Sequence, residues 1–134
     1  MDLDLKGHHF VIRTGSLAAK IVDLYMAASC VLAEQYSPKS FDIKLNDTVI
    51  DIGAHIGSFA VFAAKRAKNG RVFAYEPDPA NYKQLEKNIK ANNLSNVTLS
   101  SDAVLDRRAT ISFHKDALNT AEGSIFKPGN ETIS

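Results

Sequence analysis

The residues best suited to chemistry lie in one short turn between a predicted strand and a predicted helix, Asp51-Ile52-Gly53-Ala54-His55-Ile56-Gly57. Gly53 and Gly57 let the backbone pass close to a ligand, and the carboxylate of Asp51 just before them can hold a cationic ammonium group. A tight strand-to-helix turn that binds nothing would show the same spacing. The turn therefore indicates a ligand site only together with other signals.

Two further acidic positions follow the next two predicted strands. A carboxylate at Glu76 can accept hydrogen bonds from both hydroxyl groups of a ribose, or it can cap the helix that follows. After the third strand, Asp102 can accept from an exocyclic amine and Ala103 leaves room for a flat ring, although an exposed turn aspartate is the alternative. The carboxyl ends of parallel strands meet at one edge of a sheet. Together the three signals predict an adenosine with a positively charged tail.

The elements that must position these residues alternate between strand and helix. Strands are predicted at 48–52, 71–75 and 97–100. A helix is predicted at 58–68, and a second one is capped by Asp78 and ends at Asn92. Right-handed crossovers place the three strands in the order 3-2-1. The predicted fold class is α/β, a Rossmann-like parallel sheet.

The chain divides into a prelude, residues 1–46, and a ligand-binding half, residues 47–134. The prelude is predicted to hold a strand at 9–13 and an amphipathic helix from 17 to about 36. A fourth strand, or part of a hairpin, is predicted at 109–113, before a polar, turn-rich tail.

The composition is that of one globular domain, with 134 residues, of which 45% are hydrophobic and 23% charged. The formal net charge of +1 gives no electrostatic argument for nucleic acid or an anionic membrane, so neither partner is favoured. No signal peptide or membrane span is predicted, and the single cysteine, Cys30, is predicted to be a buried thiol in a cytoplasmic protein. His8, His9 and His114 lack metal-ligand spacing, so no metal site is predicted.

Three stretches carry a resemblance to a known family: Val49-Ile50-Asp51-Ile52-Gly53-Ala54-His55-Ile56-Gly57-Ser58-Phe59, Val72-Phe73-Ala74-Tyr75-Glu76-Pro77-Asp78-Pro79 and Leu85-Glu86-Lys87-Asn88-Ile89. They are similar to the FkbM family of class I S-adenosylmethionine-dependent methyltransferases. The resemblance covers about Asp47 to Val104 and implies a class I methyltransferase sheet with S-adenosylmethionine as cofactor.

The resemblance implies a role for each residue of the turn. Gly53, Ala54 and Gly57 would line the methionine and ribose of the cofactor. Asp51 would organise the loop and lie near the ammonium group. His55 stands where the family often has asparagine, and it either faces the methionine end or stabilises the loop.

The other two strand ends receive roles in the same way. Glu76 would hold the ribose hydroxyls, and Asp102 and Ala103 would border the adenine. Members of the family continue into a fourth sheet strand with a Lys-x-Asp-x-Glu-Gly-like motif, which is missing here. The sheet is therefore expected to be truncated after the first three β-α units, and no catalytic residue can be assigned.

The function that follows is S-adenosylmethionine-dependent methyl transfer, and the resemblance suggests a hydroxyl oxygen of a small molecule or sugar as acceptor. An RNA or protein methyltransferase is one alternative, although the near-neutral charge counts against RNA. A nucleotide-binding module without catalysis is another. An NAD-dependent dehydrogenase is disfavoured, because Ala54-His55 fills the middle of the G-x-G-x-x-G spacing that such enzymes use.

A truncated sheet has a further consequence for the first strand. Residues 48–52 would present an unpaired apolar edge, which natural proteins seldom leave open. The prelude strand, the segment 108–113 or a second copy of the chain would have to cover it. We therefore expect self-association or partial instability of the isolated chain, with little methyltransferase activity.

Overall fold

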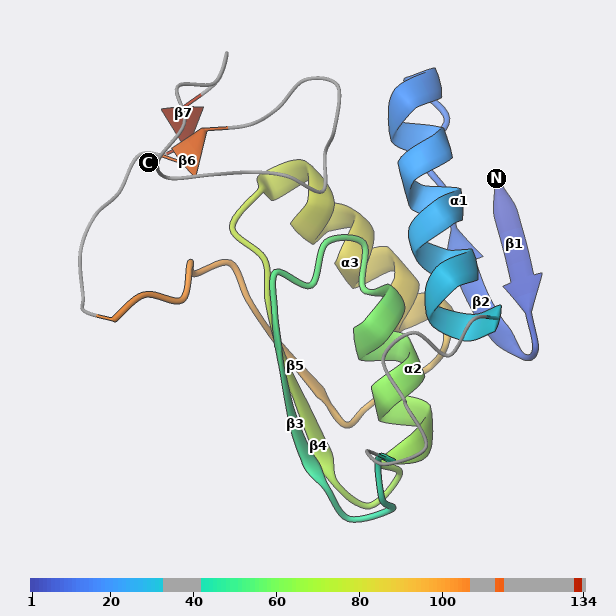
Figure 1. The fold of residues 1–134 in the computed structure, drawn as a ribbon, viewed down its shortest axis with the longest axis vertical. Coiled ribbons are helices and arrows are strands. Elements are labelled where there is room, and N and C mark those ends of the chain that lie inside the picture. The colour runs from blue at the N-terminus through green and yellow to red at the C-terminus, as the bar shows by residue number, and fades with distance from the viewer. Residues whose placement is uncertain (33–41, 107–112, 115–131, 134) are drawn as a thin grey trace.

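The computed structural model describes residues 1–32, 42–106, 113–114 and 132–133 (Figure 1). Its centre is a parallel sheet of β3 (Thr48–Ile52), β4 (Arg71–Tyr75) and β5 (Val97–Ser100), in the order β3-β4-β5. Val49 lies opposite Val72, and Phe73 lies opposite Thr98. The α/β class, the three strands and their order are confirmed.

Two helices cover one face of this sheet. In Figure 1, α2 (Ser58–Arg66) and α3 (Pro79–Ala91) lie on the same side of the strands. The side chain of Asp78 accepts hydrogen bonds from the backbone amides of Ala80 and Asn81, so the predicted N-cap is confirmed. Helix α2 ends two residues before the predicted Lys68.

The first residues form a hairpin of which only the second strand was predicted. β1 (Asp2–Leu5) pairs antiparallel with β2 (His8–Val11) through a turn at Lys6 and Gly7, which both have positive φ. β2 ends at Val11, two residues before the predicted end of this strand at Arg13. Helix α1 (Leu17–Leu32) follows, and the predicted end of this helix near residue 36 lies outside the described residues.

The hairpin is joined to α3 by amide side chains rather than by another strand. The backbone amide of Val11 donates to Oδ1 of Asn88 at 2.7 Å, and Gln84 donates to the carbonyl of Val11. One turn further along α3, Asn92 accepts from the amide of His9 and donates to its carbonyl. From Asn88 to Asn92 the helix rises about 6 Å, and from Val11 to His9 the strand spans about 6.6 Å. The two asparagines therefore match the spacing of the backbone groups that they bind.

The hydrophobic core runs through both parts of the chain. Phe10, Ile12 and Val31 from the first 46 residues pack in one buried cluster with residues such as Val61 and Leu85. Cys30 belongs to this cluster and is fully buried, as predicted, and burial raises the pKa of its thiol to about 12. The molecule thus has three layers in Figure 1: the sheet, then α2 and α3, then α1 with the hairpin.

The second face of the sheet and one edge of β3 are uncovered within the described ranges. Ile50 and Ile52 are 62% and 63% exposed, whereas Val72 and Ala74 on the helix side are fully buried. The hairpin strand packs against α3, so it does not cover β3. The predicted strand at 109–112 lies outside the described residues, while β6 (Phe113–His114) pairs antiparallel with β7 (Thr132–Ile133). None of the helices in the described residues is long and apolar enough to cross a membrane.

Candidate cofactor site

The predicted turn is a well-ordered loop fixed to the end of β4. The backbone amides of Gly53 and Ala54 both donate to the carbonyl of Tyr75, each at 2.9 Å. Gly53 has a φ of 77°, which favours glycine, and a Cβ built there would meet no atom within 4 Å. The loop is therefore open at Gly53, where a ligand can approach the backbone.

Gly57 is needed for a different reason. Its φ is 84°, and a Cβ there would collide with Cδ1 of Leu85 in α3. It is buried between the two helices rather than open to the sheet edge. The positive φ therefore favours glycine at this position, and a larger residue would also have to displace the end of the Leu85 side chain.

Glu76 joins the loop to the next strand end. Its side chain is 4% exposed, Oε2 accepts from the amide of His55 at 2.7 Å, and Oε1 accepts from the amide of Asp78 at 2.9 Å. Burial raises the pKa of the carboxyl, while these backbone donors act to lower it. A carboxylate has about four acceptor positions, so Glu76 keeps capacity for further donors such as hydroxyl groups.

Asp51 lies beneath the loop with one oxygen unsatisfied. It is 8% exposed and accepts from the backbone amide of Ala60, but Oδ2 has no hydrogen-bond partner within the described part of the chain. Burial, and then the charge of Glu76, raise the pKa of Asp51 to about 6. Because a buried acceptor without a donor is costly, this oxygen fits a group that a ligand would supply, such as an ammonium.

His55 is directed to the interior rather than to the open side of the loop. It is 4% exposed, has a φ of 52°, and its Nε2 lies 3.3 Å from Nη2 of Arg13. Burial, and then the charge of Arg13, lower the pKa of His55 to about 4, so the ring is neutral at pH 7. These contacts support the loop-stabilising reading of His55.

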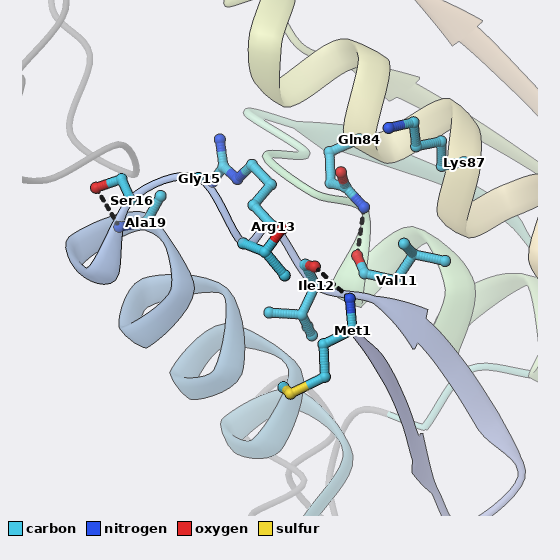
Figure 2. A pocket seen from close by; sticks show the side chains of 10 residues that line it. Met1, Val11, Ile12, Arg13, Gly15, Ser16, Ala19, Gln84 and Lys87 are labelled. Atoms are coloured by element: carbon cyan, nitrogen blue, oxygen red, sulfur yellow. Dashed lines mark hydrogen bonds between the residues drawn. The ribbon is translucent and has the colours of Figure 1, made fainter.

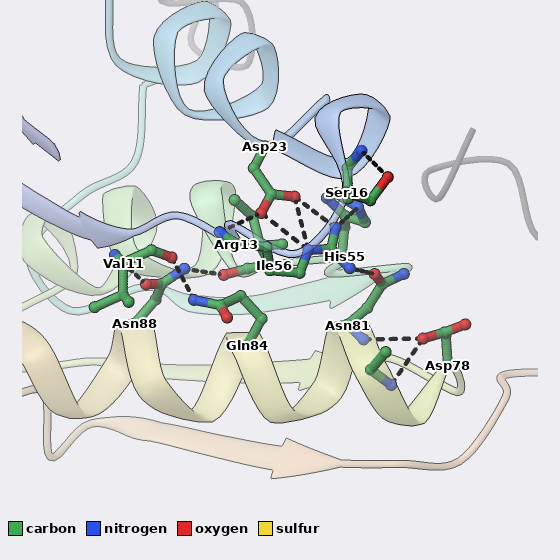
Figure 3. A network of polar contacts seen from close by, with 12 residues as sticks. Val11, Arg13, Ser16, Asp23, His55, Ile56, Asp78, Asn81, Gln84 and Asn88 are labelled. Carbon is green, nitrogen blue, oxygen red and sulfur yellow. Dashed lines mark hydrogen bonds and ion pairs between the residues drawn. The ribbon is translucent and has the colours of Figure 1, made fainter. Parts of the chain in front are cut away.

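Sequence reasoning missed the polar network behind His55, shown in Figure 3. Arg13 donates through Nε to Oδ2 of the fully buried Asp23 at 2.9 Å and through Nη1 to Oδ1 of Asn81 at 2.8 Å. One signal was available: Asp23 stands four residues from both Ala19 and Ala27, in the middle of the buried stripe of α1. An acid at such a position needs a buried partner.

The end of β5 is the third strand end at the carboxyl edge of the sheet. The carbonyl of Ser100 accepts from the amide of Glu76 at 3.0 Å, which ties the second and third strand ends together. Asp102 is exposed and accepts from the hydroxyl of Ser100 at 2.8 Å, and Ala103 is half-buried. The turn, Glu76 and the pair Asp102–Ala103 therefore share one edge of the sheet, as the strand order requires.

A separate depression of about 500 Å³ lies between the hairpin, the start of α1 and α3. Figure 2 shows Arg13, Gln84 and Lys87 on its wall, with Met1 donating to the carbonyl of Ile12 and Ser16 accepting from Ala19. Of the predicted site residues, none lines it. It is therefore distinct from the candidate cofactor site.

Comparisons with known proteins agree on the kind of domain. The model of the TRM5/TYW2 methyltransferase domain matches residues 24–115. The crystal structure of Methanocaldococcus jannaschii TYW2 in complex with AdoMet is 28% identical, with a TM-score of 0.51 over 86% of this chain and 46% of that chain. A SAM-dependent methyltransferase from Aquifex aeolicus shares the fold at 17% identity, with a TM-score of 0.52 over 73% of this chain and 50% of that one.

A curated relative points in the same direction. The M. jannaschii tRNA(Phe) (4-demethylwyosine(37)-C(7)) aminocarboxypropyltransferase is 39% identical over 64 residues, which are 48% of this chain and 26% of that protein. Two curated relatives, this one and another M. jannaschii protein, are covered over only 26% and 20% of their own length. The chain therefore corresponds to a part of such proteins.

These comparisons confirm the predicted class I methyltransferase domain but correct two finer predictions. The matched family is TRM5/TYW2, so the assignment to FkbM was wrong. The predicted small-molecule hydroxyl acceptor, and the argument against nucleic acid, were also wrong, because a relative is named for a tRNA substrate. The net charge of a chain averages over its surface and says little about a local patch of charge.

Proposed function

Because the chain belongs to the TRM5/TYW2 methyltransferase domain family, we propose that it binds S-adenosylmethionine at the carboxyl edge of its sheet and forms the cofactor half of a tRNA-modifying enzyme. The single observation that carries the cofactor assignment is the buried Oδ2 of Asp51, which has no hydrogen-bond partner within the described residues. An ammonium group would satisfy that oxygen. Gly53, two positions further along the chain, has space around it into which a ligand can come close to the backbone.

The roles that the sequence suggests are kept for Ala54, Glu76, Asp102 and Ala103. Glu76 would accept from the ribose hydroxyls with the acceptor capacity that His55, Asp78 and Asn81 leave unused. Asp102 and Ala103 would border the adenine at the end of β5. The aliphatic part of the cofactor would pass over Gly53 and Ala54.

When bound, the cofactor supplies a sulfonium carbon that a nucleophile can attack, with the bonding electron pair leaving on sulfur. The residues of this chain hold and orient the cofactor, and in such a displacement alignment of the reacting atoms provides much of the catalysis. The acceptor must reach the methyl carbon from the side opposite the sulfur. No group of the described chain is assigned as a general base.

A tRNA acceptor is supported by the family and by the named relative. The chain also carries a local row of positive charge that its net charge hides. Lys83, Lys87 and Lys90 are exposed at spacings of four and three along α3, which places them on one side of the helix. Such a row can contact phosphates, and Glu86 is the acidic residue exposed beside it.

Two labelled forms of the cofactor can be used to test the proposed function and to identify the group that is transferred. The protein is incubated with tRNA and with S-adenosylmethionine labelled either in the methyl group or in the carboxyl group. Methyl transfer moves only the first label to tRNA and leaves S-adenosylhomocysteine. If neither label reaches tRNA while a small hydroxyl compound is methylated, the proposed acceptor is wrong.

Aminocarboxypropyl transfer is the second candidate, favoured by the name of the relative that is 39% identical over 64 residues. The nucleophile would then attack the aminocarboxypropyl carbon bonded to the same sulfur, and methylthioadenosine would leave. Only the carboxyl label would reach tRNA. The same experiment therefore separates the two candidates.

A further inference from the structure

The side chain of Arg13 joins the start of the chain to the loop 53–57 and to the first turn of α3. It follows β2, and its guanidinium contacts Asp23 in α1, Asn81 in α3 and His55 in the loop (Figure 3). The arginine side chain is 16% exposed and the Asp23 side chain is fully buried. The group therefore lies inside the molecule, between three elements.

The pair with Asp23 fixes the direction of the guanidinium. Nε donates to both oxygens of Asp23, at 3.2 and 2.9 Å, and the backbone amide of Arg13 donates to Oδ2 at 3.1 Å. A guanidinium is planar and its donors form a rigid fork, so two donors on one carboxylate also fix the remaining N–H groups. Those groups are aimed at Asn81 and His55.

Both of these contacts lead to Glu76. The backbone amide of His55 donates to Oε2 of Glu76 at 2.7 Å, and the side chain of Asn81 forms a hydrogen bond with the same carboxyl group. His55 has a positive φ of 52°, a conformation that a residue other than glycine keeps only when its surroundings hold it. Arg13, which holds the His55 ring, thereby also holds the amide that fixes Glu76.

We infer that Arg13 is a positioning residue, which holds Glu76 and the loop 53–57 in the geometry that binds the cofactor. This inference rests on the proposed binding of S-adenosylmethionine at that edge. Arg13 would not touch the cofactor itself, because two intervening residues, His55 and Asn81, carry its effect. A neutral His55 ring accepts the hydrogen bond from Arg13, since arginine can only donate.

The test compares Arg13→Gln with the matched variant Arg71→Gln, which changes an exposed arginine at the start of β4. Titration calorimetry with S-adenosylhomocysteine should show affinity weakened about tenfold or more in Arg13→Gln and unchanged in Arg71→Gln. In a Glu76→Gln background, Arg13→Gln should cost little further affinity, because its effect passes through Glu76. Fully additive losses, or unchanged affinity in Arg13→Gln, would overturn the inference.

A readout without cofactor separates this inference from the proposed function. Hydrogen exchange of the amides of residues 53–57 should be faster in Arg13→Gln than in wild type and Arg71→Gln. If wild type binds no cofactor, the proposed function fails, while unchanged exchange in these amides removes the inference on its own.

Should Arg13→Gln not fold, His55→Ala and Asn81→Ala each remove one contact and keep the pair with Asp23. Unchanged exchange and affinity in both of these variants would contradict the inference.

Discussion

The amide of His55 donates to Oε2 of Glu76 at 2.7 Å, and through this bond the turn after β3 is locked to the end of β4. Twenty-one positions of sequence separate the two residues. A single buried carboxylate therefore fixes the loop and remains able to accept from a ligand.

Replacing Glu76 by Ala should weaken cofactor binding by about 1–3 kcal/mol, the usual cost of removing one partner of a charged hydrogen bond. The loop amide of His55 also loses its acceptor, so loop exchange should become faster. Titration calorimetry with S-adenosylhomocysteine measures the affinity, and Glu86→Ala on the exposed side of α3 is the control. Equal affinity of Glu76→Ala and wild type would assign Glu76 a purely structural role.

The two glycines of the turn should respond differently to substitution by Ala. Gly57→Ala should destabilise the fold by about 1–3 kcal/mol, because its Cβ would collide with Leu85 and its φ is positive. At Gly53 an added Cβ meets no atom, so Gly53→Ala should lower the free energy of unfolding by only about 1 kcal/mol or slightly more, because of the positive φ. The variant should nevertheless bind the cofactor more weakly than wild type. Thermal unfolding and calorimetry of both variants measure the contrast. A Gly57→Ala protein as stable as wild type would show that neither the contact with Leu85 nor the positive φ requires glycine at this position.

The raised pKa of Asp51 makes stability depend on pH. The carboxyl keeps its proton in the folded state up to a pKa of about 6, against 3.8 for an ordinary aspartate, so this group destabilises the fold progressively as pH rises through that window. Asp51→Asn should therefore be more stable than wild type by roughly 1–3 kcal/mol at pH 8, with little difference at pH 4. Denaturant unfolding at both pH values measures this.

The affinity for the cofactor should depend on pH in the opposite direction, because binding needs the charged form of Asp51. The charged carboxylate attracts an ammonium, so the affinity of wild type should fall as pH drops below about 6, while that of Asp51→Asn should be weaker and flat with pH. Calorimetry at several pH values is the measurement. A wild-type profile as flat as that of the variant would separate Asp51 from the ammonium.

Asn88 should be among the most sensitive positions for stability. It is fully buried, accepts from the amide of Val11 at 2.7 Å and donates to the carbonyl of Ile56 at 2.8 Å. Asn88→Ala leaves both backbone groups without their partner, at an expected cost of about 2–4 kcal/mol. Lys90→Ala, two positions away and exposed, should change little. Equal unfolding temperatures for the two variants would mean that water replaces Asn88.

Local signals in the sequence predicted the elements that position the site. The apolar runs gave the exact bounds of β3, β4 and β5, and the Asp78-Pro79 pair marked the start of α3. β1 was missed because Asp2-Leu3-Asp4-Leu5 is short and half acidic, and its partner in the structure is the neighbouring strand β2. Such a strand depends on its pairing more than on its own residues.

The contacts that hold the site together could not be read from local spacing. Arg13 and His55 are 42 positions apart, and Val11 and Asn88 are 77 apart, so only the fold brings them together. The family within the class was also missed, because the motifs around Gly53 and Glu76 reflect the cofactor that class I methyltransferases share.

Binding at the carboxyl edge of the sheet can be observed residue by residue in a titration of the isotope-labelled protein with S-adenosylhomocysteine, followed by the amide resonances. We expect saturable shifts at Gly53, Ala54, Glu76, Asp102 and Ala103, and no such shifts with NAD. Shifts confined to the depression beside Met1 and Lys87, or tighter binding of NAD, would contradict it.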